Sequence, residues 1–333
     1  MSGPGGWDGL DVSIAEVADR LAEQRRPPGG GAPYTLSGVL NLVAYAPSPE
    51  ELGPMQEVIE GLADHQASRT ILIAEAGEGS GMDATVSTSC RLAGDSTTMA
   101  LELVVLTVHG ETRAGTASAC TPLLRSELPT FLWWPLPPDT AAGGALAGLL
   151  AVADRVVTEA GRGDDATAAV RALAEWIPGE GGPAVTDLAW AAITSWRQLL
   201  VQVLDPESLE ALRPRADTAI VHAGAGPDAG ALLLAGWLRD FLGAAGAVRL
   251  RTGEGAGNGV LAVEVAGPTG RRLRVERLAG REAATVTVTE ADGTVRDRTL
   301  PLPDPDRARL LAGELEIQRR DRAFERALAR APV

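Results

Sequence analysis

The sequence contains no lysine: all 30 of its Lys and Arg positions are arginine. Neither a Schiff-base lysine nor the lysine of a phosphate-binding P-loop is therefore present. The 44 acidic residues outnumber the arginines and leave a formal net charge of −14. That balance argues against a general nucleic-acid-binding protein, which needs a basic face.

Cysteine and histidine are also scarce. The two cysteines are Cys90 and Cys120, and the histidines are His65, His109 and His222. No CxxC, HExxH or paired Cys/His spacing occurs, so the sequence offers no zinc site. With such low cysteine use, we expect Cys90 and Cys120 to be reduced, buried residues of a cytoplasmic protein.

Long apolar runs are missing as well. None reaches the ~18–20 residues of a membrane span, and the N-terminus has no charged-then-apolar signal peptide. The 333 residues, 45% of them hydrophobic, leave room for two domains and a substantial core. We therefore expect a soluble globular protein without a membrane partner.

The chain changes character near residue 34. Helical spacing from Val12 to Gln24 precedes the Pro- and Gly-rich stretch 27–33, so we interpret residues 1–33 as a helical arm and a flexible linker. Apolar strands then alternate with helices, which predicts an α/β domain over residues 34–180 with a mixed sheet covered by helices. The expected strands are 39–46, 69–74, 84–92, 100–109 and 155–158, and the expected helices are 49–62 with Ser48 as N-cap, 112–127, 145–151 and 166–176.

A second domain is expected over residues 184–333, beyond the Gly- and Pro-rich segment 178–183. A long helix from Thr186 to Val203 is followed by a strand at 218–222 and an apolar helix at 229–242. Short alternating strands follow at 247–252, 259–266, 271–277, 284–289 and 295–300, and a charged helix closes the chain from 305 to about 331. This pattern predicts an α+β domain with an antiparallel sheet that ends in a helix.

Aromatic residues make up only 4% of the chain, and five of the twelve lie in two groups. Three of them, including Trp133 and Trp134, share the run 131–138 with three prolines, which predicts a short strand that ends at Pro135. The pair either anchors a core or lines a contact site.

The second tryptophan group lies at helical spacing. Trp190, Ile193, Trp196 and Arg197 follow one another at three- and four-residue steps and share one helix face. A tryptophan stripe of this kind belongs more often to a core than to a site. Here it could pack against Trp133 and Trp134 and join the two halves.

No ordinary catalytic group emerges from the remaining polar residues. The Gly224–Gly230 segment lies between a strand and a helix, where phosphate can bind. Its spacing is one residue longer than the dinucleotide fingerprint, and a tight strand-to-helix turn is the better interpretation. His65 and Ser68 lack a GxSxG elbow and a third partner. Arg69 can bind an anion or pair with a carboxylate. The arginine run 271–281 is either a solvated sheet face or a surface for an acidic partner.

Several segments together resemble the OpcA family of glucose-6-phosphate dehydrogenase assembly proteins. They are residues 40–46, 65–70, 120–129, 131–135, 153–156, 187–197 and the closing segment 311–328, in order along the chain. The combination of the tryptophan pair with the tryptophan helix is the most specific part of the resemblance.

The resemblance implies a cytoplasmic, non-catalytic protein that binds glucose-6-phosphate dehydrogenase and promotes its assembly or activity, which would influence NADPH supply in the oxidative pentose phosphate pathway. It implies no catalytic, cofactor-binding or metal-binding residues and no nucleic-acid partner. The candidate interaction or domain-anchor residues are Arg69, Trp133, Trp134, Pro135, Asp154, Arg155, Trp190, Trp196 and Arg197. The alternative is a sugar-phosphate or nucleotide-binding enzyme that uses Arg69, Arg155 and the Gly224–Gly230 turn.

Overall fold

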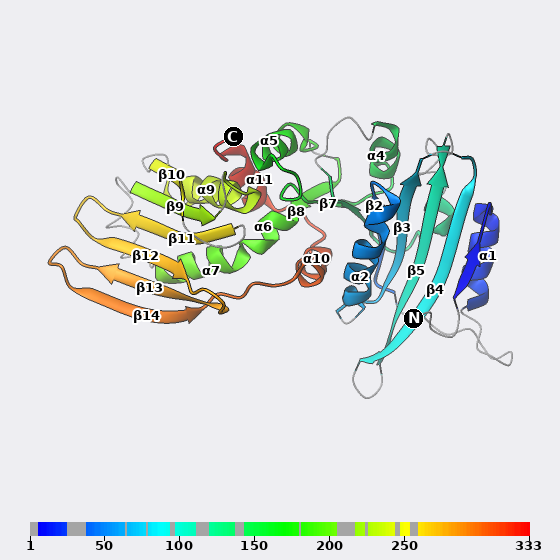
Figure 1. Cartoon of the computed structure of the whole chain (residues 1–333), viewed down its shortest axis with the longest axis horizontal. Coiled ribbons are helices and arrows are strands. Elements are labelled where there is room, and N and C mark those ends of the chain that lie inside the picture. The colour runs from blue at the N-terminus through cyan, green and yellow to red at the C-terminus, as the bar shows by residue number, and fades with distance from the viewer. Residues whose placement is uncertain are drawn as a thin grey trace. The chain divides into compact units, whose positions relative to one another are not determined.

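The chain forms two compact units, each described here by itself (Figure 1). The computed structural model describes residues 6–24, 38–63, 65–77, 79–93, 97–110, 120–136, 143–179, 181–204, 217–223, 226–243, 247–253 and 259–333. The first unit comprises Met1–Thr158, Pro178–Thr186 and Arg307–Arg319, and the second comprises Glu159–Ile177, Asp187–Asp306 and Arg320–Val333. The expected linker at 27–33 lies outside the described residues, and the expected domains 34–180 and 184–333 stay a prediction.

The first unit contains an eight-stranded mixed sheet in the order β1-β4-β5-β3-β2-β6-β7-β8. Its strands are β1 Trp7–Gly9, β2 Leu40–Ala46, β3 Ser68–Ala76, β4 Met82–Ala93, β5 Thr97–His109, β6 Thr130–Trp134, β7 Arg155–Thr158 and β8 Ala184–Asp187. From β5 through β3, β2 and β6 to β7 the pairing is parallel, whereas β4 is antiparallel to both β1 and β5. Every residue of β2 is buried, as expected for a central parallel strand covered on both faces.

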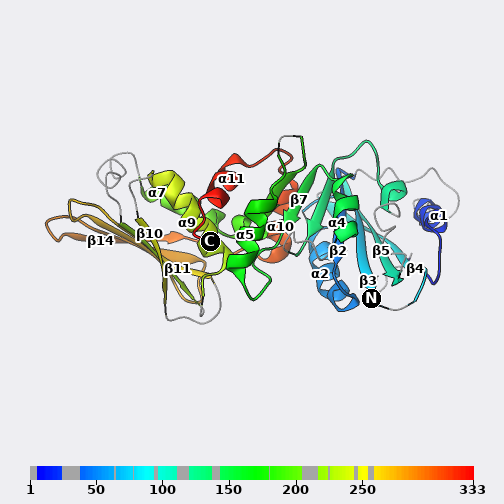
Figure 2. The same ribbon diagram turned by 90° about the horizontal axis from the view of Figure 1, so that it is seen from above.

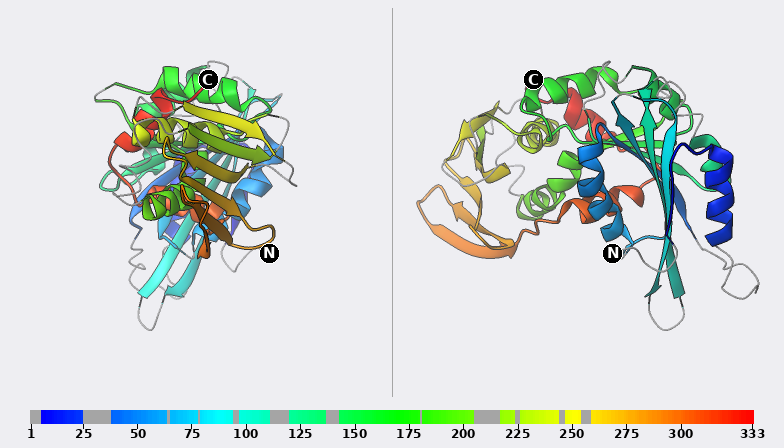
Figure 3. Two further views of the ribbon diagram at one scale, coloured as in Figure 1. Left: turned by 90° about the vertical axis from the view of Figure 1, so that its left-hand side faces the viewer. Right: turned by 45° about the vertical axis from the view of Figure 1, so that its right-hand side comes forward.

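Helices cover both faces of this sheet. They are α1 Ile14–Gln24, α2 Leu52–Leu62, α4 Gly143–Leu150 and α10 Arg307–Leu315. Two views place α1 and α2 on opposite faces (Figure 2 and Figure 3). Gly61 of α2 faces Ala308 of α10 so closely that a Cβ at Gly61 would lie 2.9 Å from the Ala308 side chain. The final part of the chain thus completes the layer that the first part begins.

Two local expectations for the first unit differ from the structure. Ser48 holds the N-cap position of a 3₁₀ turn, Pro49–Glu51, that leads into α2, but its side chain makes no capping hydrogen bond. Residues 112–119 of the expected helix 112–127 lie outside the described residues. After the helical Cys120, the described part holds the 3₁₀ turn Thr121–Leu123, and residues 124–127 form an irregular loop instead of a helix. Asn41 explains this loop, because its buried amide nitrogen donates to the Arg125 carbonyl at 2.9 Å and its oxygen accepts from the Arg125 N–H at 3.0 Å. Backbone groups satisfied in this way need no helix.

The second unit contains a six-stranded sheet in the order β10-β9-β11-β12-β13-β14. Its strands are β9 Asp217–Ala223, β10 Ala247–Thr252, β11 Gly259–Ala266, β12 Arg272–Arg277, β13 Ala283–Thr289 and β14 Val295–Pro301. All neighbours are antiparallel except β9 and β10, which are parallel. The expected fold class, α/β with a mixed first sheet and an antiparallel second sheet, is confirmed, and the parallel pair β9 and β10 is the departure from it.

The helices of the second unit are α5 Ala166–Trp176, α6 Leu188–Ala192, α7 Thr194–Val203, α9 Ala229–Leu242 and α11 Arg322–Ala329. α9 is buried along most of its length and packs on α11, α6 and α5. Gly236 permits this packing, because a Cβ there would lie 1.9 Å from the Ala327 carbonyl oxygen. In the described part of the chain, no helix is both long and apolar enough to cross a membrane.

Two expected helices are broken in the structure. Thr186 does not cap a helix but lies in β8, and Asp187 caps α6 instead, since its Oδ1 accepts from the Ala189 N–H at 2.8 Å. The expected helix 186–203 is also interrupted at Ile193, where α6 ends and α7 begins. The closing helix also divides, because Asp321 accepts from two N–H groups and so begins α11 as a separate helix.

Candidate functional site

The tryptophan pair lies in the core of the first unit. Trp133 and Trp134 are both 0% exposed, and every residue of β6 is buried. Trp134 stacks on Tyr45 of β2 with ring centroids 4.2 Å apart, and the Arg307 guanidinium lies 4.8 Å from the centre of the Trp133 ring. Pro135 is buried too. Rings without exposed surface favour the first of the two sequence interpretations, so we propose these residues as anchors of the first unit.

The second tryptophan group organises the second unit. Trp190 donates its indole N–H to Asp321 at 2.8 Å, and its ring packs on Phe324. The Arg197 guanidinium lies 3.6 Å from the centre of the Trp190 ring, so the expected shared face does bring these two residues together. Trp196 is buried and lies beneath Arg277. The expected packing between the two tryptophan groups stays a prediction.

Arg69 pairs with a carboxylate rather than presenting a free cation. Its Nε donates to Glu102 at 2.8 Å and its Nη1 donates to the Leu123 carbonyl at 2.8 Å. Arg69 is 7% exposed and Glu102 is 2% exposed. The pair therefore ties β3 to β5 and to the loop before β6, and it leaves the guanidinium inaccessible to a ligand in solution.

The turn before α9 holds a carboxylate where a phosphate would have to bind. Gly224 and the residue after it lie outside the described part of the chain, but Asp228 is described and accepts from the Ala231 N–H through Oδ1 at 2.6 Å. An aspartate at the helix N-terminus satisfies a backbone donor and repels a second anion. In the described residues 226–230, this hydrogen bond favours the expected strand-to-helix turn over a phosphate site.

The other polar candidates also have structural roles. His65 is exposed, whereas Ser68 is buried and its hydroxyl lies 3.2 Å from that of Thr70. Ion pairs join Arg271 to Glu290, Arg274 to Glu264 and Glu276, and Arg277 to Asp304. The hydrogen bond and charge of Arg274 hold the pKa of Glu276 below its usual range. This pairing favours a solvated sheet face for the arginine run.

Cys120 is a free, buried thiol whose pKa is raised by desolvation to about 12. Such a thiol is protonated at neutral pH and is a poor nucleophile. The side chain of Cys90 lies outside the described residues, so the expectation for that cysteine stays a prediction.

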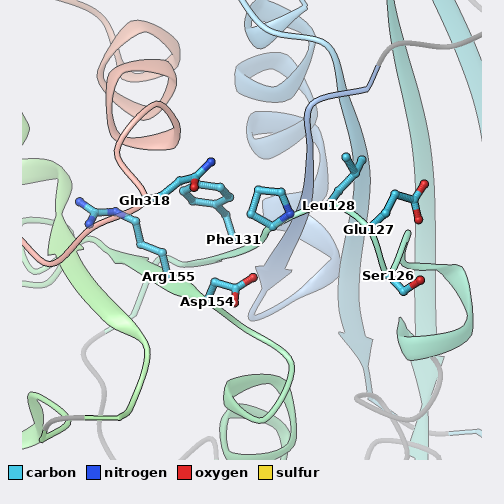
Figure 4. A pocket seen from close by; sticks show the side chains of 8 residues that line it. Ser126, Glu127, Leu128, Phe131, Asp154, Arg155 and Gln318 are labelled. Atoms are coloured by element: carbon cyan, nitrogen blue, oxygen red, sulfur yellow. The ribbon is translucent and has the colours of Figure 1, made fainter.

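A cleft of about 490 Å³ opens at the beginnings of β6 and β7 (Figure 4). Because these strands are parallel neighbours, their first residues lie at the same edge of the sheet. The residues that line the cleft are Ser126, Glu127, Leu128, Pro129, Phe131, Asp154, Arg155 and Gln318. Two of them, Asp154 and Arg155, are among the candidate residues that the sequence resemblance indicates.

Asp154 fixes the edge of the sheet at which the cleft opens. Its Oδ2 accepts from the Thr130 N–H at 2.8 Å, and its own N–H donates to the Thr130 carbonyl at 2.8 Å. The Asp154 carbonyl accepts from the N–H of Ala184, which begins β8, at 3.0 Å. One exposed residue therefore aligns the starts of three strands while its carboxylate stays at the surface.

Arg155 points the other way and is entirely buried. Its Nη2 donates to Glu314 of α10 at 2.8 Å, and its Nη1 donates to the Arg319 carbonyl at 2.8 Å. These bonds hold the segment after α10 in place, so that Gln318 forms one wall of the cleft (Figure 4). Glu314 and Gln318 were missed as site residues, although both lie in the closing segment that carries part of the resemblance.

The cleft lies at the amino ends of the parallel strands, whereas open α/β sheets bind substrates at the carboxyl ends. No histidine or cysteine is among its lining residues. Across the described residues, no group of three His, Cys, Asp or Glu side chains is placed to hold a metal ion.

Comparison with known families gives the context of this cleft. Residues 60–175 match the family described as the glucose-6-phosphate dehydrogenase subunit N-terminal domain, and residues 183–328 match the corresponding C-terminal domain. The chain belongs to the OpcA family. Both matches contribute to the cleft, since Asp154 lies in the first and Gln318 in the second.

A curated relative and a solved structure add to the family match. The putative OxPP cycle protein OpcA of Synechocystis sp. is 23% identical over 201 residues, which are 60% of this chain and 41% of the relative. This chain thus spans less than half of that OpcA relative. The crystal structure of glucose-6-phosphate 1-dehydrogenase from Mycobacterium avium is similar with a TM-score of 0.50 and 10% identity, over 88% of this chain and 91% of that chain. This likeness concerns the fold alone.

Proposed function

We propose that this chain is a non-catalytic partner that binds glucose-6-phosphate dehydrogenase and promotes its assembly or activity. It would thereby influence NADPH production in the oxidative pentose phosphate pathway. The observation that carries the proposal is the pair of family matches, both of which are described as parts of a subunit of that dehydrogenase.

The engagement of the candidate ligand-binding arginines supports a role without catalysis. Arg69 and Arg155 are buried in ion pairs with Glu102 and Glu314, and Asp228 occupies the start of α9. The alternative enzyme needed these two arginines and that helix start to bind a phosphate. The total lack of lysine also removes the most common Schiff-base and phosphate-binding side chain.

Differential binding is the proposed mechanism. A partner that binds one conformation or oligomer of the dehydrogenase more tightly shifts the population toward it, and a tenfold preference corresponds to about 1.4 kcal/mol. Assembly and conformational activation differ in one measurable respect. Help with assembly fades when the dehydrogenase is concentrated enough to assemble alone, whereas a conformational effect is independent of its concentration.

The test measures complex formation and rate with the dehydrogenase from the same organism. Co-elution on size exclusion is combined with NADP⁺ reduction at saturating glucose 6-phosphate, across a dilution series of the dehydrogenase with and without this chain. We expect a complex and a higher rate in its presence. If there is neither co-elution nor any change of rate at any dilution, the proposal is wrong.

The chain by itself supplies the control for the enzyme alternative. Calorimetry with NADPH and glucose 6-phosphate should give no tight binding, and the isolated chain should not reduce NADP⁺. Tight binding of either compound by the isolated chain would instead support the sugar-phosphate or nucleotide-binding enzyme.

A further inference from the structure

We propose that the cleft at the starts of β6 and β7 receives a basic side chain, arginine or lysine, of the dehydrogenase partner. This inference rests on the proposed function and assigns it a contact site. It follows from the charges that line the cleft, from the chemistry of its walls, and from how firmly its key carboxylate is held.

Among the described residues that line the cleft, Asp154 is a carboxylate without a cation in contact. Arg155 is neutralised by Glu314 at 2.8 Å. Glu127 pairs with Arg125 at 3.0 Å. Asp154 is exposed, and among the described residues the hydrogen-bond partner of its carboxylate is the Thr130 backbone N–H, from which Oδ2 accepts. An anion at a concave site attracts a positively charged group, and in a chain of net charge −14 no excess of arginine opposes it.

The walls of the cleft match the rest of a basic side chain. Leu128 and Pro129, both partly exposed, supply apolar surface on which the aliphatic stem of an arginine or lysine can lie, and Phe131 is buried behind it. Gln318 is exposed and flanks Phe131 opposite Asp154, where its amide oxygen offers a second acceptor (Figure 4). A guanidinium or ammonium group placed there finds acceptors on two sides.

The open form of the cleft favours a side chain delivered by a protein over a free ligand. Asp154, Glu127 and Gln318 are all exposed, whereas sites for small molecules bury most of the ligand surface. A metal ion needs several converging ligands, and the described residues provide no group of three. A partner that brings its own surface closes such a cleft on docking.

Asp154 is also held in position before any partner arrives. Its carboxylate and its backbone N–H both bond to Thr130, and its carbonyl bonds to Ala184. A side chain fixed in this way loses little conformational freedom on binding, which favours affinity.

Two substitutions with opposite expected effects test the inference. Asp154→Asn keeps an oxygen that accepts from Thr130 but removes the charge, and Gln318→Glu adds a carboxylate of the same size to the facing wall. Asp164→Asn is the matched control, because Asp164 is an exposed aspartate outside the cleft. The dissociation constant of the complex with the dehydrogenase is measured for each full-length variant at low and at high salt.

We expect Asp154→Asn to weaken the complex by about tenfold at low salt and Gln318→Glu to strengthen it. The changes in dissociation constant of both variants should become smaller at high salt, because salt screens the interaction between the charges. Asp164→Asn should bind like the original chain. Unchanged thermal unfolding of Asp154→Asn shows that its loss of affinity is local.

The outcomes separate this inference from the proposed function. If the original chain binds the dehydrogenase and Asp154→Asn binds equally well at low salt, the cleft is not the contact site while the proposed function stands. If Gln318→Glu weakens the complex, the cleft does not receive a cation. Saturation of the isolated chain by spermidine or arginine amide, abolished by Asp154→Asn, would show a free-ligand site and overturn the assignment to a partner. If the original chain does not bind at all, both proposals are wrong.

Discussion

The buried ion pair of Arg155 and Glu314 gives a quantitative prediction about stability. The two side chains meet at 2.8 Å, and the residues are 0% and 6% exposed. Glu314→Leu removes the carboxylate and leaves the guanidinium charge in the core, where the Arg319 carbonyl is its remaining partner among the described residues. Breaking one side of a buried pair costs about 3–5 kcal/mol of unfolding free energy.

The double substitution separates the cost of an unpaired charge from the value of the pair itself. Arg155→Met combined with Glu314→Leu leaves an apolar contact of similar volume. Because both charges then avoid desolvation, we expect the double variant to lie within about 2 kcal/mol of the original chain or above it. The coupling energy of the cycle should therefore be several kcal/mol.

An exposed pair in the same unit serves as the control. Arg20 and Glu23 on α1 lie closer together, at 2.6 Å, but their side chains are 47% and 56% exposed. Glu23→Gln should cost less than about 1 kcal/mol, since water already solvates both charges. The Arg20–Glu23 pair should thus contribute less to the free energy of unfolding than the Arg155–Glu314 pair, although its distance is shorter, because burial and not distance decides the effect.

Urea unfolding measured by tryptophan fluorescence provides the free energies, and Trp133 and Trp134 in the same unit report on its core. The reasoning fails if Glu314→Leu costs no more than Glu23→Gln. It also fails if the double variant is as destabilised as the sum of the two single variants, since that result would mean that the charges do not interact.

Three further outcomes are expected. Gly236→Ala should destabilise the chain by about 1–3 kcal/mol, because the new Cβ would collide with the Ala327 carbonyl. Gly313→Ala on α10 is the control: its Cβ meets nothing within 4 Å, and the substitution should stabilise the chain by up to about 1 kcal/mol. Equal effects of the two substitutions in urea unfolding would contradict this expectation. Burial raises the pKa of the Cys120 thiol to about 12 from 9.0, so in a variant whose other cysteine is serine the thiol should resist Ellman's reagent at pH 8 until the chain unfolds. The free energy of unfolding should also fall as the pH rises above about 9, because the unfolded chain then loses the thiol proton more readily than the folded chain. Rapid labelling of the folded chain would contradict the burial of this thiol. Trp133→Ala should cost about 3–5 kcal/mol of stability, and a variant that stays fully stable yet loses the dehydrogenase would instead make Trp133 a binding hot spot.

Local patterns were sufficient for most elements of the second unit. The helices Ala166–Trp176 and Ala229–Leu242 and the strands Ala247–Thr252 and Gly259–Ala266 have the bounds that their periodicity and turn residues predicted. In these segments the hydrophobic period, the capping aspartate and the flanking glycines all specify the same structure.

Tertiary contacts explain where the local patterns failed. The sequence 305–331 has a helical composition throughout, but Asp321 accepts the indole N–H of Trp190 and the first N–H groups of α11, which fixes a helix start there. The loop after Leu123 is held by the amide of Asn41, 84 residues away in sequence from Arg125. No window of neighbouring residues contains such information.

The candidate site depends on the same kind of distant contact. Spacing drew attention to neither Asp154 nor Arg155, and the resemblance identified them without showing that they point in opposite directions. The partner of Arg155, Glu314, lies 159 residues further along the chain. The sequence therefore could not show that Arg155 is a buried structural cation while the neighbouring Asp154 is an exposed anion.

The cleft exists only because the end of the chain returns to the first unit. The C-terminal family match runs from residue 183 to 328, yet its segment Arg307–Arg319 belongs to the first unit, where it supplies Glu314 to Arg155 and Gln318 to the cleft wall. A fragment that ends with the N-terminal family match would leave the Arg155 charge buried without a counter-ion and would lack that wall. A partner that recognises the cleft therefore recognises a surface to which both family domains contribute, and a chain must contain both to present it.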